Sequence, residues 1–340
     1  MTELISVIIP VHNAALYLNK IFMEISSQTY RNLEMIPVDD GSEDESAEII
    51  KEWQKKDERI RPIFQESSGV SEARNAGLLA SHGAYIMFLD ADDEIKPDMI
   101  FSLFGALVIF EEKYGLRAGL SICGYEEIFA SGKIVTHLPG KDSYAGRGMM
   151  EALFDDSGFF SAVWNKLFRR DILYDSNGKL ILFETGVHIA EDTLYLTRIL
   201  KNAMYAAVNK KILYHWKRHA ESATHGIRCG SQVCLTRRDI TVLKAYRLIV
   251  YELSDYDRTL SQNAKRIYLG LLRDFLVEAE KEKKDRLRAH LEYLACKEFQ
   301  NFQVKNIRDW TFAVKYKLCL WMIRNRMSPV LIECISRKGR

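Results

Sequence analysis

Continuous apolar runs alternate with amphipathic stretches over the first ninety residues of the chain. The runs have the length and β-branched composition of strands buried on both faces, and they lie at residues 4–11, 33–38, 60–64 and 85–89. The stretches at 14–28 and 67–80 show a helical spacing of apolar positions, the second after a Gly-containing loop. Because strands and helices alternate with short connections, the pattern predicts a parallel, doubly wound α/β sheet.

Further along, the pattern changes from mixed to helical. Three elements should complete the first domain, namely a helix at 97–113, a strand at 116–124 and a hairpin through residues 131–133. From residue 230 onward the periodicity is helical, at 233–253, 260–280 and 286–302. The expected organisation is an α/β domain over residues 1–228 and an appended helical region over residues 229–340.

The composition is that of an ordinary folded protein. The 340 residues are 47% hydrophobic and 28% charged, with a net charge of +2, so long disordered segments are not expected and overall charge indicates no particular partner. The six cysteines form no CxxC pair and no signal peptide is apparent, which predicts a reduced, cytoplasmic protein without a disulfide framework or zinc site. The longest uncharged apolar run, residues 99–110, is too short to span a bilayer.

Carboxylates gather where two of the predicted strands end. Asp39 and Asp40 close the second strand, and Asp90, Asp92 and Asp93 follow the fourth. Like charges at the end of a buried strand are costly unless a cation or hydrogen-bond donors compensate them. Oxygen ligands of this kind suit Mg²⁺ or Mn²⁺, which often share their coordination shell with substrate phosphates. The simpler alternative is an acidic turn that caps the following helix.

Four motifs stand in order within these ninety residues, although the GxGxxG of a dinucleotide fold and a P-loop lysine are absent. They are IIPVHN (8–13), VDDGS (38–42), GVSEARNAGL (69–78) and FLDADD (88–93). In this order and spacing they resemble the nucleotide-sugar domain of glycosyltransferase family 2. The resemblance implies a GT-A fold, which is a Rossmann-like, mostly parallel sheet with flanking helices, here followed by the C-terminal helical region.

The resemblance also implies a nucleotide-sugar site, made of Pro10, His12, Asn13, Asp40, Arg74, Asn75, Asp90, Ala91, Asp92 and Lys217. In that site Asp40 accepts a hydrogen bond from the uracil ring, and Arg74 and Asn75 lie beside the nucleotide. Asp90 and Asp92 hold the Mn²⁺ or Mg²⁺ ion that bridges the diphosphate, with Asp93 as support or an alternative ligand. His12 departs from the more usual aromatic residue and either stacks on the base or fills space.

A second pair of acids, Glu191 and Asp192, opens a predicted amphipathic helix. Acids at a helix N-terminus are stabilised by the helix dipole, so a purely structural role is one explanation for this pair. The resemblance implies more: Asp192 is the general base that takes the acceptor hydroxyl's proton in an inverting transfer, and Glu191 contacts the acceptor or supports the base.

Two further segments match the family less sharply. Trp164, Asn165 and Lys166 would lie near the acceptor cleft, and the alternative is ordinary packing of the tryptophan with a solvated lysine. Lys217 stands where the family usually has arginine in a lid over the diphosphate, a lid that His219 and Ser222 would join. Lysine keeps the charge but loses the bidentate fork, and a solvated basic loop is the alternative.

The last thirty-six residues differ from the rest of the chain. Residues 305–340 hold nine Lys or Arg against two acids, interleaved with aromatic residues. Such a composition suits the headgroup region of an anionic membrane, although the basic residues do not fall on one helical face. Peripheral contact with the cytoplasmic face of the plasma membrane, packing onto the first domain and self-association into a homo-oligomer all stay open. No nucleic-acid-binding module is present, so nucleic acid is not an expected partner.

The combined reading is a metal-dependent, inverting glycosyltransferase that moves a hexosyl or N-acetylhexosaminyl group from a UDP-sugar to an acceptor hydroxyl. Resemblance to bacterial members of the family suggests a saccharide or lipid-linked acceptor in cell-surface polysaccharide or glycoconjugate assembly. A glycoprotein acceptor is the main alternative. A non-catalytic nucleotide- or saccharide-binding protein on the same fold is a different class, and a nucleotidyltransferase is disfavoured because its basic, Gly-rich entry loop is missing.

Overall fold

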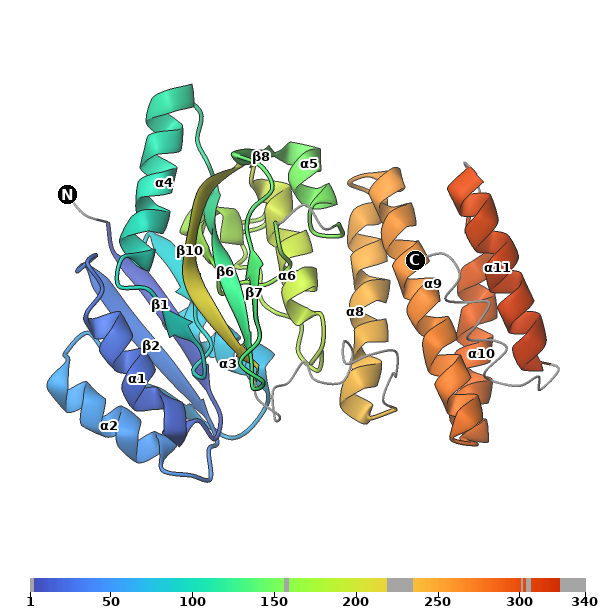
Figure 1. Ribbon diagram of the computed structural model, residues 1–340, viewed down its shortest axis with the longest axis horizontal. Coiled ribbons are helices and arrows are strands. Elements are labelled where there is room, and N and C mark those ends of the chain that lie inside the picture. The colour runs from blue at the N-terminus through green and yellow to red at the C-terminus, as the bar shows by residue number, and fades with distance from the viewer. Residues whose placement is uncertain (1–2, 156–158, 219–234, 301, 304–306, 325–340) are drawn as a thin grey trace. The chain divides into compact units, whose positions relative to one another are not determined.

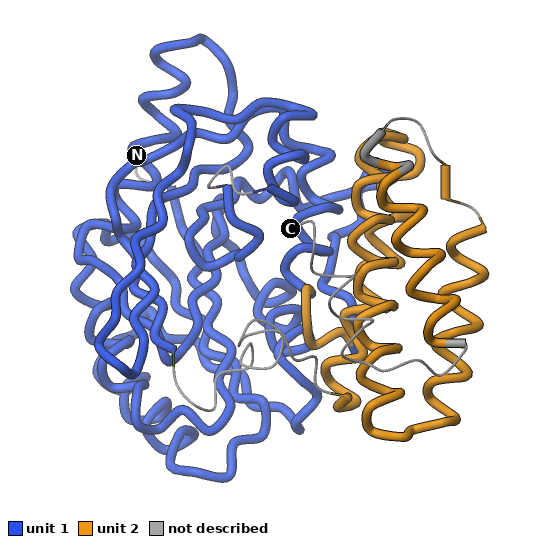
Figure 2. Tube along the Cα trace, turned by 45° about the vertical axis from the view of Figure 1, so that its right-hand side comes forward, with its two compact units in different colours: residues 1–186, 191–222 blue, residues 187–190, 223–340 orange. Residues whose placement is uncertain are grey.

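The computed structural model describes residues 3–155, 159–218, 235–300, 302–303 and 307–324. Its backbone divides into two compact units, the first made of residues 1–186 and 191–222 and the second of residues 187–190 and 223–340 (Figure 2). The boundary predicted after residue 228 falls inside 219–234, outside the described residues, so that boundary stays a prediction.

The first unit is built on one mixed sheet with the strand order β3-β2-β1-β4-β9-β6-β10-β5, to which β7 and β8 add at β6 and β10 (Figure 1). The strands are β1 Ile5–Val11, β2 Leu33–Asp40, β3 Ile63–Gln65, β4 Tyr85–Phe88, β5 Glu94–Ile95, β6 Leu120–Phe129, β7 Ile134–His137, β8 Ser143–Ala145, β9 Lys166–Arg169 and β10 Tyr205–Arg218. The helices are α1 Ala15–Ser26, α2 Ser46–Lys56, α3 Val70–Ala80, α4 Met99–Tyr114, α5 Gly146–Glu151 and α6 Glu191–Ile199, with 3₁₀ turns η1 Arg170–Leu173 and η2 Leu200–Asn202.

The parallel half confirms the alternating pattern. β3, β2, β1 and β4 are mutually parallel, and both faces of the central strands are covered. Val7 and Ile9 pack with α1 residues such as Phe22 on one face, whereas Val38 packs with Ala73 of α3 on the other. Burial on both faces is why these strands are apolar throughout. The third strand is shifted: only an isolated bridge forms at Ile60, and β3 begins at Ile63.

The other half of the sheet differs from the sequence prediction. The strand expected at 116–124 begins at Leu120 and runs to Phe129, and the predicted hairpin with β7 is confirmed. Lys217, which was expected in a lid or in a solvated basic loop, belongs to the long strand β10, which pairs in parallel with β6. The pairing register shifts around Ile212, and the polar run 209–211 interrupts any period-two pattern. A bulged strand of this kind lacks the alternation by which strands are recognised.

The second unit is helical, as expected. Its helices are α8 Arg237–Ser254, α9 Arg258–Lys281, α10 Asp285–Gln300 and α11 Ile307–Arg324. Apolar residues of α9, including Leu272 and Phe275, form its core with Leu291 of α10 and Cys319 of α11. Among the described residues, no helix has both the length and the apolar composition that a bilayer crossing requires.

The contact between α3 and β1 gives a stability prediction. A Cβ added to Gly77 of α3 would overlap the Cγ2 methyl of Ile8, which is fully buried and stiff. We expect Gly77→Ala to lower the free energy of unfolding by about 1–3 kcal/mol through overpacking. Gly105→Ala in α4 is the matched control, because nothing lies within 4 Å of its added Cβ; it should raise stability by about 0.5–1 kcal/mol. Urea unfolding of both variants checks this, and a Gly77→Ala variant as stable as wild type would contradict it.

Candidate functional site

The loops after β1 and β2 are joined at the carboxyl end of the parallel strands. Asn13, in the left-handed region at φ 51°, donates its N–H to the Ser42 hydroxyl at 2.9 Å, and its side-chain oxygen accepts from the Glu43 N–H at 2.8 Å. The ring of His12 is exposed, and its Nδ1 donates to the Asp40 carbonyl at 2.8 Å, because a carbonyl only accepts. Pro10 lies partly exposed near the end of the same strand. The first two motifs therefore form one connected surface.

The carboxylate of Asp40 is buried and fastens the loop that leads into α3. Its Oδ1 accepts from the Gln65 side chain at 2.7 Å and the Ser68 N–H at 2.9 Å, and its Oδ2 accepts from the Gly69 N–H at 2.8 Å. An ionised carboxylate has about four acceptor positions, so Oδ2 keeps room for another donor. Gly41 is required next to it, since a Cβ there would lie 2.7 Å from the Ser67 nitrogen and its φ is +68°.

Arg74 of α3 is the centre of the site. Its side chain is buried, and its two terminal nitrogens contact carboxylates from two distant segments. Nη2 lies 3.1 Å from Asp90 Oδ1, and Nη1 lies 2.8 Å from Asp192 Oδ1 and 3.2 Å from Glu191 Oε1. The guanidinium also lies over the Phe183 ring, 5.4 Å from its centroid. The sequence therefore brings the two acidic motifs together through one arginine.

Asn75, the neighbour of Arg74, forms a reciprocal hydrogen-bonded pair with a backbone segment. Its side-chain nitrogen donates to the Phe183 carbonyl at 3.0 Å, and its oxygen accepts from the Phe183 N–H at 2.8 Å. Phe183 in turn stacks on Tyr195 of α6, with ring centroids 3.9 Å apart. Asn75 thus holds the ring on which Arg74 rests, and no sequence pattern pointed to Phe183 or Tyr195. Contact of Asn75 with a nucleotide stays a prediction.

The three aspartates after β4 have different surroundings. Asp90 and Asp92 are half-buried, on either side of buried Ala91. Asp93 is buried and is held by β10, because its Oδ2 accepts from the Tyr214 hydroxyl at 2.5 Å and its Oδ1 from the Lys217 N–H at 2.7 Å. Burial, together with the charges of Asp92 and Asp90, raises the pKa of Asp93. Asp93 therefore supports the turn, which leaves Asp90 and Asp92 as the pair for an ion.

Whether Asp90 and Asp92 can hold a metal ion depends on the ligands that are available around them. In the described part of the chain no group of three or more His, Cys, Asp or Glu is arranged to hold a metal. Two carboxylates nevertheless suit Mg²⁺ or Mn²⁺ when substrate phosphates complete the shell. The oxygen donors of Asp90 and Asp92 are thus compatible with an ion that arrives with a diphosphate, and metal binding stays a prediction.

Glu191 and Asp192 begin α6, directly after Ala190, whose φ is +62°. Besides its contact with Arg74, Asp192 accepts the Val163 N–H on Oδ2 at 3.3 Å. Burial raises the pKa of Asp192 to about 7; Arg74 opposes this rise, and the Glu191 and Asp90 charges add to it. Burial likewise raises the pKa of Glu191. A carboxylate poised near neutral pH and held at both oxygens has the properties of a general base.

The segment before β9 is part of the interior. Trp164 is buried and stacks on Tyr214, with ring centroids 4.3 Å apart. Asn165 donates to the Cys123 carbonyl at 2.8 Å. Lys166 is fully buried, so the alternative of a solvated lysine was wrong. Trp164 packs in the interior, which was the alternative to a place near the acceptor cleft. An acceptor role for this segment stays a prediction.

Lys217 lies on β10, next to the acidic turn. Its Nζ lies 2.9 Å from Oε1 of Glu94, and Glu94 is the residue that follows the three aspartates. Glu94 also contacts Lys20. His219 and Ser222 lie outside the described residues, so the predicted lid is not tested by this geometry.

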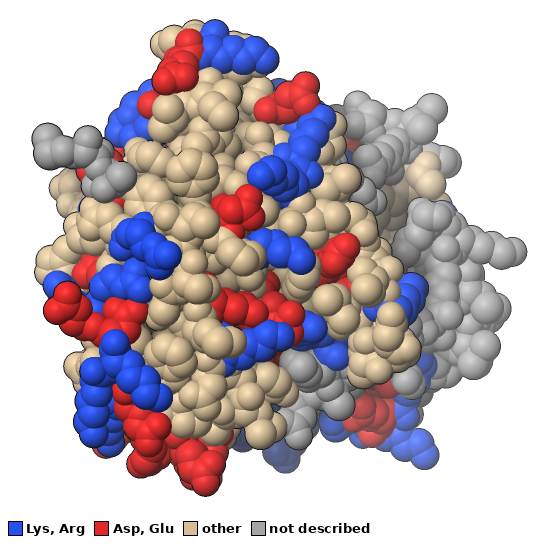
Figure 3. Space-filling model, turned by 60° about the vertical axis from the view of Figure 1, so that its left-hand side comes forward, with Lys and Arg blue, Asp and Glu red and all other residues tan. Residues whose placement is uncertain are grey.

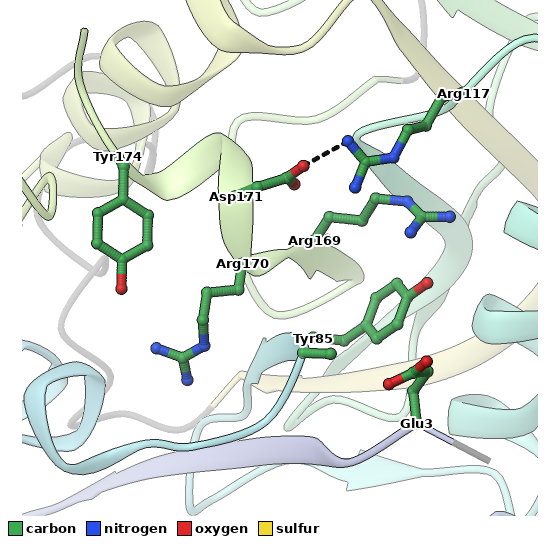
Figure 4. A pocket seen from close by; sticks show the side chains of 8 residues that line it. Glu3, Tyr85, Arg117, Arg169, Arg170, Asp171 and Tyr174 are labelled. Atoms are coloured by element: carbon green, nitrogen blue, oxygen red, sulfur yellow. Dashed lines mark ion pairs between the residues drawn. The ribbon is translucent and has the colours of Figure 1, made fainter. Parts of the chain in front are cut away.

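A cavity of about 540 Å³ lies elsewhere, at the amino-terminal ends of β1 and β4 (Figure 4). Its arginines are already engaged: Arg117 pairs with Asp171, Arg169 pairs with Glu111 at 2.5 Å, and Arg170 donates to a backbone carbonyl. Two of these cations are thus paired with a carboxylate, and Arg170 is hydrogen-bonded to the Gly83 carbonyl and the Ser81 hydroxyl. The carboxyl ends of the strands therefore remain the candidate site, as is usual for open α/β sheets.

Known proteins resemble the chain in sequence and in fold. The family model described as "Glycosyl transferase family 2" matches residues 6–113. Glycosyltransferase GlyA of Streptococcus pneumoniae is 32% identical over 233 residues, which are 62% of this chain and 32% of the relative. EpsJ of Bacillus subtilis, an uncharacterized glycosyltransferase, is 28% identical over 228 residues, which are 66% of this chain and 64% of the relative. The chain thus matches about a third of the first relative's length and just under two thirds of the second's.

A solved structure resembles nearly the whole chain. S. aureus TarS 1–349, crystallised in complex with UDP-GlcNAc, has a TM-score of 0.67 at 17% identity and covers 99% of this chain and 92% of its own. This likeness shows the fold, including a helical region after the mixed sheet. The sequence matches and the fold together support a family 2 glycosyltransferase, with a GT-A fold followed by a C-terminal helical region.

Proposed function

We propose that the protein is an inverting glycosyltransferase that moves a sugar from a UDP-sugar to an acceptor hydroxyl. The observation that carries the proposal is the junction at Arg74, where Asp90 of the donor motif and Asp192 of the predicted base contact one guanidinium. A shared contact keeps the donor side and the acceptor side of the site close together. The TarS fold, solved with UDP-GlcNAc, supports a UDP-sugar as donor.

The reaction is a single displacement. Asp192 takes the proton of the acceptor hydroxyl as that oxygen forms its bond to the anomeric carbon, and the bond from this carbon to the UDP oxygen breaks with its electron pair. Attack from the side opposite UDP inverts the configuration, and no covalent enzyme intermediate forms. The raised pKa of Asp192 lets it accept a proton near neutral pH, and its contacts with Arg74 and the Val163 N–H fix its orientation.

Asp90 and Asp92 would hold a Mn²⁺ or Mg²⁺ ion, which when bound supplies positive charge beside the departing diphosphate. The remaining donor contacts are assigned to this chain's own residues. The exposed ring of His12 and the remaining acceptor position of Asp40 would hold the uracil base of the donor. Lys217 would add charge near the diphosphate by exchanging its contact with Glu94.

The acceptor is the less constrained half of the proposal. Resemblance to bacterial family members favours a saccharide or lipid-linked saccharide in cell-surface polysaccharide or glycoconjugate assembly. A glycoprotein acceptor is the alternative within the same chemistry. A non-catalytic binding protein would not need a carboxylate held at both oxygens with its pKa near 7, and this observation favours the enzyme.

A donor panel tests the activity and its metal requirement together. Purified protein is incubated with UDP-, GDP- and dTDP-sugars and Mn²⁺, and nucleotide release is measured. We expect slow hydrolysis of one UDP-sugar that EDTA abolishes. In calorimetry, Mn²⁺ should raise the UDP affinity of wild type, and Asp92→Ala should lose this metal-dependent affinity. Asp98→Ala is the control, because Asp98 pairs with Lys211 outside the site. No nucleotide bound under any condition would favour the non-catalytic alternative.

The role of Asp192 predicts a pH dependence. Because only the ionised base accepts a proton, kcat/KM of wild type should rise as the pH increases through about 7. Asp192→Asn should keep UDP affinity, lose at least a hundredfold in kcat, consistent with about 10²–10⁴ for general acid–base catalysis, and lose this pH limb. Asp285→Asn is the matched control, since Asp285 also stands in the first turn of a helix but is exposed. An Asp192→Asn variant with the wild-type rate would rule out the assignment.

We also propose that the C-terminal region makes peripheral contact with the cytoplasmic face of an anionic membrane. On α11 the side chains of Val314, Leu318 and Trp321 are 47%, 41% and 56% exposed at helical spacing, with exposed Lys317 beside them. Leu318→Glu should weaken co-flotation with anionic vesicles, whereas Leu16→Glu, at an exposed position of α1, should not. Equal flotation of both variants would contradict the proposal, and a concentration-dependent dimer that Leu318→Glu dissolves would favour self-association.

A further inference from the structure

Lys166 is a buried cation for which the proposed chemistry so far has no use. It is the first residue of β9 and its side chain has no exposed surface. Its ammonium donates to the Phe160 carbonyl at 2.7 Å, the Ala162 carbonyl at 2.7 Å and the Asn165 side-chain oxygen at 2.8 Å. These three acceptors use all three of its protons. Burying a charge is costly, and burial lowers the pKa of Lys166 to about 7. The three acceptors offset part of this cost when the ammonium is charged.

The two carbonyls belong to a strained turn. Phe160 has φ +61°, a left-handed conformation that is rare for a large aromatic residue. Such strain persists only where the surroundings fix it, and it gathers at functional sites. The Lys166 ammonium binds the carbonyl of Phe160 itself and that of Ala162, two residues later. Through Asn165, which donates to the Cys123 carbonyl while the Cys123 N–H donates back at 3.1 Å, the turn is fastened to β6.

The next residue of the turn contacts the proposed base. The Val163 N–H donates to Asp192 Oδ2, while Asp192 Oδ1 faces Arg74. Arg74 and the turn thus hold the two oxygens of one carboxylate from two sides. Without the turn, Asp192 could rotate about its side-chain bonds and still keep its contact with Arg74.

We propose that Lys166 is a positioning residue for sugar transfer, which fastens the strained turn at Phe160–Ala162 so that the Val163 N–H orients the carboxylate of Asp192. The inference rests on the proposed function, since it assigns no chemistry to Lys166 itself. It differs from a purely structural role, because it predicts a defect confined to the base and not to the fold or the donor site.

Lys166→Met tests this, since methionine fills similar space without the three donors. We expect a folded protein with wild-type UDP affinity and donor KM, a kcat lower by about 10- to 100-fold, as a small misplacement of a reacting group causes, and an acid limb of kcat/KM moved to higher pH. The limb moves up because the carboxylate loses a donor that stabilises its ionised form. Lys265→Met is the matched control: Lys265 is also buried, on α9, and its loss should leave kcat and the limb unchanged.

Two further measurements separate the outcomes. On the Asp192→Asn background, Lys166→Met should cause no additional loss of kcat, because the group it positions is absent. If Lys166→Met does not fold, Val163→Pro replaces it, since this variant deletes the N–H donor and should show the same signature with Lys166 in place. Wild-type kcat and limb in the variant, or an equal loss on both backgrounds, would overturn the inference. A wild-type protein without turnover would instead overturn the proposed function.

Discussion

The contact of one buried guanidinium with three carboxylates is the interaction on which the site depends. Arg74 lies within hydrogen-bonding distance of Asp90, Glu191 and Asp192, so this cluster carries two more negative charges than positive ones when fully ionised. Burial raises the pKa of both Glu191 and Asp192, and the charge of the neighbouring Asp90 adds to the rise while Arg74 opposes it. A diphosphate would add further negative charge. The cluster therefore favours a donor that arrives with its own cation, which is the physical argument for a divalent ion at Asp90 and Asp92.

The surroundings of Arg74 also explain why it cannot move freely. Its ring partner, Phe183, is held by the amide of Asn75 and stacked on Tyr195. The planar fork of arginine presents two terminal nitrogens in a fixed geometry to carboxylates on two segments, whereas a lysine has a single terminal nitrogen. Charges are spread differently over the surface, where basic and acidic side chains are interspersed on the face drawn in Figure 3, as expected from a net charge of +2.

The hydrophobic pattern of the sequence predicted the parallel half of the sheet, because burial on both faces determines which residues its strands contain. The apolar runs of β1, β2 and β4 follow from burial on both faces, and the motifs that follow β2 and β4 and open α6 pointed to Asp40, Asp90 and Asp192, whose roles stay predictions. What could not be predicted depends on partners far along the chain. The strand β10 is bulged where it pairs with β6, and the burial of Lys166 depends on a turn that it encloses itself. The residues next to a lysine in the sequence do not show whether its side chain is buried or solvated.

The topology explains why that turn lies at the site. β9 runs antiparallel to β4, with Leu167 opposite Met87, so its first residue lies at the carboxyl end of the strand that leads into Asp90. Any chain that enters β9 must therefore pass the rim where the acidic motifs meet. In the segment that enters β9, Phe160 has a positive φ, and Lys166 donates to the carbonyls of Phe160 and Ala162. The same turn supplies the Val163 N–H to Asp192, so the requirement of strand pairing and the orientation of the base are met by one segment.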